Sequence, residues 1–221
     1  MERSINQNDR PILWGRGSST NVQKVIWTSF ELGLEIDHRP LAGEFGGNKE
    51  DWFLELNPNG TVPVWQDRDF ALYESQAILR YLAREHGRLY GSNPRETAQV
   101  DCWLDWFALV FWPPVRMLFL DVVRDKKREL RDPEAQDALQ KTARSVDIVT
   151  DRLLKSEHLA GPKFTIADIS MTIGMNRLLG MDVGVSPHPY LRTWLDEKRA
   201  REGFQKAVAD EPVMCKTSDL I

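Results

Sequence analysis

The chain has 221 residues, of which 42% are apolar, and its formal net charge is -4. This length suits one large domain or two modest ones, and intermixed acidic and basic residues give no case for nucleic-acid binding. No apolar run comes near the about 18 residues that a membrane-spanning helix needs, so we expect no membrane segment. The polar start, Met1 to Arg10, has no apolar core of a secretory signal and is expected to be a flexible leader.

The two cysteines, Cys102 and Cys215, lie far apart and form no C-x-x-C pair. This usage fits a reducing compartment, and we expect a cytoplasmic protein. Cys102 has apolar neighbours in a helical pattern, so we expect it to be packed rather than reactive.

The first part of the chain alternates strand and helix patterns. The predicted elements are a strand over 11–14, a loop over 15–20, a helix over 21–33, a strand over 34–40, a glycine-rich segment over 41–49 and a short helix over 50–56. The helix shows apolar residues at helical spacing. Its place between two strands predicts a parallel pair joined by a right-handed crossover.

The stretch from Asn57 to Trp65 combines turn dipeptides with an apolar strand pattern that contains Pro63. Proline has no N–H for a sheet ladder, so we expect either a sheet edge or a bend in which the peptide between Val62 and Pro63 is cis. The backbone N–H and C=O of Val62 would then face outward, where an extended peptide ligand can pair with them.

A short strand over 70–73 follows, and a strong helical pattern begins at Glu74 and Ser75. The free N–H groups and the dipole of a helix N-terminus favour an anion. We therefore expect an anion-binding position at Glu74 and Ser75.

The residues NPNGTVPVW (57–65) and ESQAILRYL (74–82) resemble the glutathione-binding signature of the glutathione transferase family. The resemblance implies that Val62 pairs with the cysteinyl backbone of glutathione and that Glu74 and Ser75 hold its γ-glutamyl end. An ordinary strand-turn-strand-helix unit with a chance proline is the alternative. The element order up to this helix is that of the thioredoxin-like fold.

The second half of the chain is predicted to be all helical. A break at 91–94 precedes a long apolar segment over 95–125, which Pro113 and Pro114 are expected to kink or break. A charged bend over 126–132, an amphipathic helix over 133–157 and one or two helices over 189–209 complete the pattern. Thr165 and Asp168 form a capping box, which we interpret as structural, as in the family.

The fold class expected is therefore an α+β thioredoxin-like domain followed by an all-α helical domain. We place the glutathione-binding domain at 11–86 and the helical domain at 93–221.

An enzyme that uses glutathione must favour the thiolate of a thiol whose pKa is about 8.5. A hydroxyl donor at a helix N-terminus does this, and Ser18, Ser19 and Thr20 stand at such a position. The run from Ser19 to Val25 resembles the segment around the active serine of serine-type, phi-class relatives, which assigns the catalytic role to Ser19. Ser18 is the competing choice, Asn21 is an assisting amide, and plain helix capping is the alternative.

Two residues that relatives use for other reactions are absent, and their absence narrows the reaction type. Trp14 stands where a tyrosine-type relative has its tyrosine, and the loop contains no cysteine. Conjugation or peroxide chemistry is therefore favoured over thiol-disulfide exchange.

Lys49 lies eight residues before Asn57, a spacing that matches a lysine which meets the glycine carboxylate of glutathione in phi-like relatives. A solvated loop lysine is the alternative, and Arg16 is the second choice for that carboxylate. His38 is expected to be a surface residue of its strand, and no histidine has the spacing of a metal ligand.

The resemblance implies a transferase that conjugates glutathione, as co-substrate, to a small hydrophobic electrophile, with no permanently bound cofactor and a role in detoxification. We expect a homodimer with no nucleic-acid or membrane partner. The electrophile is expected between the two domains, although core packing is the commoner use of the aromatic residues that are candidates for its wall. Those candidates are Trp14, Phe107, Phe111 and Trp112. A glutathione-dependent peroxidase or dehalogenase, or a family member that binds glutathione without turnover, is the alternative.

Overall fold

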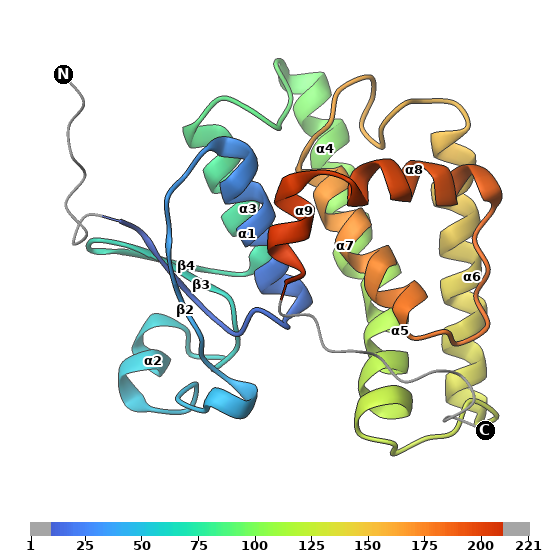
Figure 1. Cartoon of the computed structure of the whole chain (residues 1–221), viewed down its shortest axis with the longest axis horizontal. Coiled ribbons are helices and arrows are strands. Elements are labelled where there is room, and N and C mark those ends of the chain that lie inside the picture. Colours follow the sequence, from blue (N-terminus) through green and yellow to red (C-terminus); the bar gives the residue numbers. More distant parts are fainter. Residues whose placement is uncertain (1–9, 210–221) are drawn as a thin grey trace. The chain divides into compact units, whose positions relative to one another are not determined.

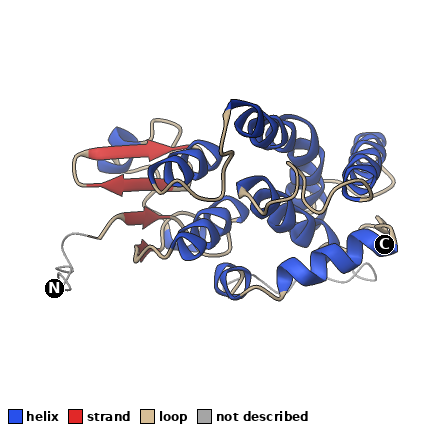
Figure 2. Cartoon of the chain, turned by 90° about the horizontal axis from the view of Figure 1, so that it is seen from above, coloured by secondary structure: helices blue, strands red, loops and turns tan. Residues whose placement is uncertain are grey.

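The computed structural model describes residues 10–209 (Figure 1). One compact unit contains the chain up to Arg88 and the segment from Glu202, and the other runs from Leu89 to Arg201. Figure 2 shows that strands occur in the first unit and helices alone in the second. The expected leader up to residue 9 and Cys215 lie outside the described residues.

The helical domain expected over 93–221 differs from the second unit at its end. Helix α9 (Glu202–Ala207) belongs to the first unit, where it packs against α1 (Thr20–Leu32). Gly203 permits this approach, because a Cβ at that position would lie 2.5 Å from Trp27. The ring of Phe204 also packs edge-on against Trp27 at 5.4 Å between centroids.

A four-stranded sheet forms the centre of the first unit. Its strands are β1 (Ile12–Trp14), β2 (Asp37–Arg39), β3 (Val64–Asp67) and β4 (Phe70–Tyr73), in the spatial order β2-β1-β3-β4. The strands β1 and β2 are parallel, as the sequence predicts, while β3 is antiparallel to both β1 and β4. Pro63 lies directly before β3, so no sheet hydrogen bond is lost to it.

Two separate groups of helices cover this sheet. Helices α1 and α3 (Ser75–Glu85) pack against each other and bury their apolar faces. The helix α2 (Asp51–Leu56) and the short turn η2 (Gly43–Phe45) lie apart from them (Figure 1). Phe53 of α2 is fully buried in a small core with Leu41 and Val64, against which Trp14 packs.

The second unit is built around α7 (Ile166–Gly180). This helix contacts α4 (Pro94–Trp106), α5 (Trp112–Met117) and α8 (Pro189–Arg199), and α6 (Pro133–Leu153) packs against α5 and α8. The apolar residues of α7 with at most 2% exposure are Ile166, Ala167, Ile169, Met171, Ile173, Met175 and Leu178. A helix that is buried on nearly every side belongs in a core.

The prolines at 113 and 114 do not end the helical segment. They occupy the first turn of α5, where a missing N–H is tolerated. Two π-helical stretches, η3 (Phe107–Phe111) and η4 (Leu118–Arg124), flank α5, and the helical path runs from Pro94 to Arg124. The expected break is thus a change of hydrogen-bond pattern within one helix.

The expectation that no segment suits a membrane needs correction. The helical stretch Pro94–Arg124 is long and apolar enough to cross one by length and composition, with 33% of its most apolar window buried. This is weak evidence, since core helices pass the same test. Its residues Leu104, Phe111 and Val115 are fully buried, and the stretch packs against α6 and α7.

Cys102 of α4 is exposed, contrary to the expectation that it is packed. Helix α4 buries Val100 and Leu104, which are four residues apart and share one face. Cys102 lies between them in sequence and therefore points away from that face.

The capping box at the start of α7 is confirmed. The Thr165 hydroxyl accepts a hydrogen bond from the Ala167 N–H at 3.3 Å, and the Asp168 carboxylate accepts one from the Thr165 N–H at 2.8 Å. The Leu159 N–H donates to the same carboxylate at 3.0 Å. Asp168 is fully buried, so these donors replace the water that its carboxylate loses.

Candidate functional site

The sheet register brings three loops to one end of the first unit. Trp14 of β1 pairs with Val64 of β3, and Val64 pairs with Tyr73 of β4. The segments that follow β1, precede β3 and follow β4 therefore emerge at the same end of the sheet. These segments contain Ser19, Val62 and Glu74.

Gly15 holds the first of these loops against the second. A Cβ on Gly15 would lie 2.5 Å from Val22 and 3.0 Å from Val62, and its φ of +147° suits glycine. The first turn of α1 and the segment before β3 therefore meet at this residue. The Gly15 N–H donates to the Arg39 carbonyl at 2.9 Å, and the His38 Nε2 lies 2.7 Å from the Gly15 carbonyl. His38, expected at the strand surface, thus anchors the loop.

Ser19 occupies the N-cap position of α1, but its side chain makes no capping hydrogen bond. Its carbonyl accepts the first helical bond, from the Gln23 N–H at 2.9 Å. The N–H groups of the first turn have no acceptor within the helix. The side chain of Ser19 is half-buried. The interpretation of Ser19 as a plain cap therefore gains no support from the geometry.

Ser18 and Asn21 lie on either side of this position and are half-buried as well. Asn21 is the second residue of α1. Both side chains are therefore near enough to the helix N-terminus to assist or replace Ser19.

The peptide between Val62 and Pro63 is cis, which is one of the two arrangements that the sequence predicts. Within residues 10–209, no backbone partner is found for the N–H or the C=O of Val62. The pairing of this main chain with an extended ligand therefore stays a prediction that the backbone geometry permits.

Asn57 braces the loop that presents Val62, a role that the sequence analysis did not assign. Its side-chain amide donates to the Thr61 carbonyl at 2.7 Å, and its side-chain oxygen accepts from the Asn59 N–H at 3.1 Å. Asn57 is 1% exposed. The turn dipeptides in the sequence are the signal that could have identified it.

Lys49 is exposed and lies beside the same loop. Its ammonium is 3.4 Å from the Asn59 carbonyl, and a Cβ on Gly60 would lie 2.7 Å from it. Asn48 fixes this arrangement by donating to the Gly60 carbonyl at 2.7 Å. The Lys49 ammonium therefore lies beside Asn59 and Gly60, which precede Val62 by three and two residues.

Arg16, the second choice for a carboxylate partner, lies over Gly43. A Cβ on Gly43 would be 3.0 Å from the Arg16 Cδ, and the Arg16 N–H donates to the Leu41 carbonyl at 2.9 Å. Arg16 is half-buried, so its side chain serves at least in part to pack the glycine-rich segment.

Glu74 and Ser75 begin α3. Glu74 is the N-cap residue, with φ +69° and ψ 110°, and its side chain makes no capping bond. It is exposed, whereas Ser75 is 5% exposed. The helix N-terminus is therefore open at this position too, with a carboxylate beside it.

Lys24 is a charged residue of this region that the sequence analysis missed. It lies on α1 and is 1% exposed. Burial lowers the pKa of Lys24 from 10.5 to about 7, while the nearby Glu74 carboxylate acts in the opposite direction. The signal in the sequence was a lysine placed between Val22 and Val25 on a mainly apolar helix.

The aromatic residues expected to line an electrophile site divide into two groups. Phe107 and Phe111 are at most 1% exposed and pack on each other at 5.5 Å. They also pack against Gly174 of α7, where a Cβ would lie 2.5 Å from Phe107. Both are thus interior residues of the helical unit.

Trp14 and Trp112 are half-buried. The Trp14 indole donates to the Gln66 side chain at 2.9 Å and packs on Trp52 at 5.0 Å between centroids. Trp112 stacks on Phe107 at 5.8 Å. Each of the two tryptophans retains an accessible edge on its own unit.

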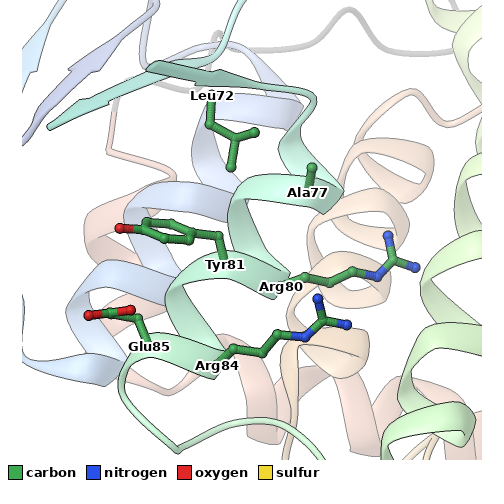
Figure 3. A pocket seen from close by; sticks show the side chains of 6 residues that line it. All are labelled: Leu72, Ala77, Arg80, Tyr81, Arg84 and Glu85. Atoms are coloured by element: carbon green, nitrogen blue, oxygen red, sulfur yellow. The ribbon is translucent and has the colours of Figure 1, made fainter. Parts of the chain in front are cut away.

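A hollow of about 480 Å³ lies on β4 and α3 (Figure 3). Its lining residues are Leu72, Ala77, Arg80, Tyr81, Arg84 and Glu85. Arg80 and Arg84 extend to one side of it, and Tyr81 and Glu85 to the other. Burial raises the pKa of Tyr81, and the charges of Glu85 and Asp67 add to the effect. None of the residues singled out in the sequence analysis lines this hollow.

Comparison with known proteins shows the family of the chain. Residues 18–85 match the family model described as "Glutathione S-transferase, N-terminal domain", and residues 105–202 match "Glutathione S-transferase, C-terminal domain". Glutathione S-transferase GstB of Escherichia coli strain K12 is 35% identical over 201 residues, which cover 89% of this chain and 96% of that protein. A glutathione S-transferase of Hyoscyamus muticus is 29% identical over 204 residues, with coverages of 89% and 96%.

Comparison with a solved structure agrees with these family and sequence matches. The theta class glutathione S-transferase from Xanthomonas axonopodis pv. citri, with glutathione bound, superposes with a TM-score of 0.84 at 34% identity. The match covers 90% of this chain and 97% of that protein.

Proposed function

The chain belongs to the glutathione S-transferase family and is a glutathione transferase, and we propose that it joins the thiolate of glutathione to small hydrophobic electrophiles. Its fold, a thioredoxin-like α+β domain followed by an all-α domain, is the one expected from the sequence. In the reaction, the sulfur of the thiolate forms a bond to an electrophilic carbon, and either a leaving group departs with its electron pair or the carbon framework takes up a proton.

The open N-terminus of α1 carries this proposal. The Ser19 hydroxyl is not used to cap the helix, so it donates a hydrogen bond to the sulfur of glutathione. The helix dipole and the free N–H groups of the first turn favour the thiolate over the thiol. Asn21 supports the same position through its amide.

The three loops at this end of the sheet hold the rest of glutathione. The N–H and C=O of Val62 pair with its cysteinyl backbone, as a strand pairs with a sheet edge. Lys49 meets the glycine carboxylate, and Glu74 and Ser75 hold the amino and carboxylate groups of the γ-glutamyl end. The closeness of Gly15, Val22 and Val62 supports this arrangement, because it joins the sulfur position to the backbone-pairing position.

For the electrophile, we propose that the half-buried Trp14 and Trp112 contribute to its wall. Phe107 and Phe111 are left out, since both are interior residues. Their role is to hold the helix that carries Trp112, through the stacking of Phe107 on that residue.

We also propose a cytoplasmic homodimer. Phe70 and Tyr73 of the edge strand β4 are 42% and 36% exposed, next to the hollow on α3. The hollow presents arginines on one side and Glu85 on the other, so it has the self-complementary charges that a twofold interface needs. Sedimentation at micromolar concentration tests this directly, because a monomer mass of 25.5 kDa would contradict it.

The decisive experiment measures thiolate formation in the complex. Ultraviolet difference absorbance of bound glutathione, followed against pH, should give a thiol pKa at least about 1.5 units below the free value of about 8.5. In Ser19→Ala this depression should largely vanish, and kcat should fall about 100-fold, the size typical of a lost donor to a developing charge.

Ser18→Ala is the matched variant, one residue away in the same loop. It should keep the depressed thiol pKa and most of the turnover. If Ser18→Ala loses both while Ser19→Ala keeps them, the catalytic hydroxyl is that of Ser18. An undisturbed thiol pKa in the wild-type complex would make the protein a glutathione binder without activation.

A further inference from the structure

Arg16 is a half-buried arginine with an unpaired guanidinium. Within residues 10–209, its side chain makes no hydrogen bond, ion pair or ring contact. Other half-buried arginines of the described chain are paired, as Arg10 is with Glu35 at 2.6 Å and Arg128 with Glu134 at 3.0 Å. Charges that lose part of their water are usually paired in proteins. The unpaired guanidinium of Arg16 therefore needs an explanation.

The side chain of Arg16 is held in place by the glycine-rich segment. A Cβ on Gly43 would lie 3.2 Å from the Arg16 Nε and 3.4 Å from its Cζ, so the guanidinium rests against the bare backbone of this glycine. The Arg16 N–H also donates to the Leu41 carbonyl at 2.9 Å. The guanidinium is thus positioned before a ligand arrives, which lowers the ordering cost of binding.

The carboxylates close to Arg16 in the fold do not neutralise it. Glu44 is exposed and forms no ion pair with Arg16. Asp37 of β2 is paired with Arg39 at 2.6 Å. A guanidinium binds a carboxylate through two parallel hydrogen bonds, which makes it the cation best suited to that group. A carboxylate supplied by a ligand would complete the pairing that the described chain does not provide.

Arg16 belongs to the same turn as Ser19, the proposed thiolate-stabilising residue, because the Ser19 N–H donates to the Arg16 carbonyl at 3.1 Å. It also follows Trp14 of β1 by two residues, a spacing that places both side chains on one side of an extended chain. Trp14 packs on the core that contains Leu41, and Arg16 rests on Gly43 of the same segment. The end of β1 thus presents an aromatic ring and a guanidinium on one side, directly before the turn of Ser19.

We propose that Arg16 determines the class of electrophile, and that its guanidinium binds the carboxylate of an electrophile with an apolar ring and one negative charge. The inference deepens the proposed function and rests on it, because it places the electrophile beside the turn of Ser19. Lys49, beside Asn59 and Gly60, is the separate cation for the glycine carboxylate of glutathione. The two cations stand on different loops, so each can meet a carboxylate of a different substrate.

The test compares two electrophiles that differ in charge, para-chloro-meta-nitrobenzoate and the corresponding benzamide. In both, the thiolate sulfur bonds to the ring carbon that holds chlorine, and chloride leaves with the electron pair of the broken bond. Each kcat/KM is divided by the rate constant of the uncatalysed reaction with glutathione, which corrects for the different reactivity of the two rings. The corrected value in the wild type should be about tenfold higher for the benzoate. Equal values, or a higher value for the benzamide, overturn the inference.

Arg16→Met removes the charge and keeps most of the stem that packs on Gly43. It should lower kcat/KM about 30-fold for the benzoate, in the range for hydrogen bonds to charged groups, and less than about threefold for the benzamide. Arg16→Lys should keep part of the preference, because it retains the charge without the planar fork. In both variants the Kd of S-methylglutathione, measured by calorimetry, should stay within about twofold, as expected for sites without shared partners.

Arg39→Met is the matched control. The Arg39 guanidinium lies 5.1 Å from the centre of the Trp14 ring, but it already has Asp37 as a partner. This variant should leave the preference for the benzoate unchanged, and a loss equal to that in Arg16→Met overturns the inference. Equal losses for benzoate and benzamide in Arg16→Met would reduce Arg16 to a packing residue. A weaker Kd of S-methylglutathione, with no loss specific to the benzoate, would assign Arg16 to the glycine carboxylate. Both results overturn the inference as well.

Two further outcomes separate this inference from the proposed function. Turnover of the benzamide without any preference for the benzoate leaves the proposed function in place and overturns the inference alone. Turnover of neither electrophile contradicts the proposed conjugation, and the inference falls with it. If Arg16→Met does not fold, unsubstituted benzoate and benzamide are compared as inhibitors of the wild-type benzamide reaction. Inhibition that is about tenfold stronger with benzoate supports the inference, and equal inhibition overturns it.

Discussion

Helices α1 and α7 begin in opposite ways. At the start of α7, Thr165 and Asp168 satisfy each other and the helix N–H groups, and Asp168 is fully buried. At the start of α1, Ser19 occupies the same N-cap position with no capping bond from its side chain. Serine and threonine are both good capping residues, so residue type does not explain the difference.

We interpret this difference as one between a residue that serves the fold and a residue that we propose to serve a ligand. A closed N-terminus contributes to stability, since it satisfies donors that would otherwise be orphaned. An open N-terminus gives up that contribution and keeps its donors and dipole for an anion. The start of α3, where Glu74 makes no capping bond either, belongs to the open kind.

The largest effect on stability is expected from removal of the Asp168 carboxylate, which belongs to the capping box at the start of α7. Asp168→Ala leaves the N–H groups of Leu159 and Thr165 without their buried acceptor. The free energy of unfolding should fall by about 4 kcal/mol, measured by urea denaturation. Asp196→Ala, which removes an exposed carboxylate from α8, should cost no more than about 0.5 kcal/mol. A loss below about 1 kcal/mol for Asp168→Ala would mean that the box does not stabilise α7.

The next prediction concerns Lys24 of α1, the helix with the open N-terminus. Here the change in the free energy of unfolding should have the opposite sign. Lys24→Met should raise the free energy of unfolding at pH 6 by on the order of 3 kcal/mol. The unfolded chain holds the lysine proton up to about pH 10.5 and the folded chain only to about pH 7. The wild type therefore loses stability as pH falls from about 10.5 to about 7, and the full penalty is present below that.

Denaturation of both proteins at pH 6 and pH 9.5 checks this sign. The advantage of the methionine variant should be largest at pH 6 and shrink at pH 9.5. A variant less stable than the wild type at pH 6 would show that the ammonium of Lys24 supports the fold, and the contrast between a stabilising and a functional terminus would weaken.

The smallest effect compares the two N-cap hydroxyls directly. Thr165→Ala should cost about 1 kcal/mol of stability, as lost caps do, because its hydroxyl accepts the Ala167 N–H. Ser19→Ala should change stability by less than about 0.5 kcal/mol, since its hydroxyl caps nothing. Thermal unfolding of both variants gives the comparison. Equal losses would show that Ser19 is a structural cap as well.

The sequence predicted the local structure around the candidate site where neighbouring residues determine it. The turn dipeptides and the proline at 63 specify the cis bend before β3, and the pattern after Tyr73 places the start of α3. The strand over 70–73 and the capping box were located at the right residues as well. These features depend on residues near in sequence, so one segment carries the information.

Features that depend on distant packing were missed or placed wrongly. The burial of Lys24 follows from the packing of α1 on α3, and the anchoring of Gly15 by His38 follows from the pairing of β1 with β2. The assignment of α9 to the first unit depends on Gly203 meeting Trp27. The contacts of His38 and Gly203 have no local signal in the sequence, and the only signal for the burial of Lys24 is its place between Val22 and Val25 on a mainly apolar helix.

The π-helical stretch η3 affects how many residues the helical path from Pro94 to Arg124 can contain. A π-helical turn bonds each N–H one residue further back than an α-helical turn, so it accommodates one additional residue within a helix. Ala108, Leu109 and Val110 of this stretch are exposed, and Leu109 is 77% exposed. Removal of one of them would convert the turn to α-helix and leave the flanking helices in phase. The chain can thus lose one residue here while the same faces of α4 and α5 stay turned toward α7.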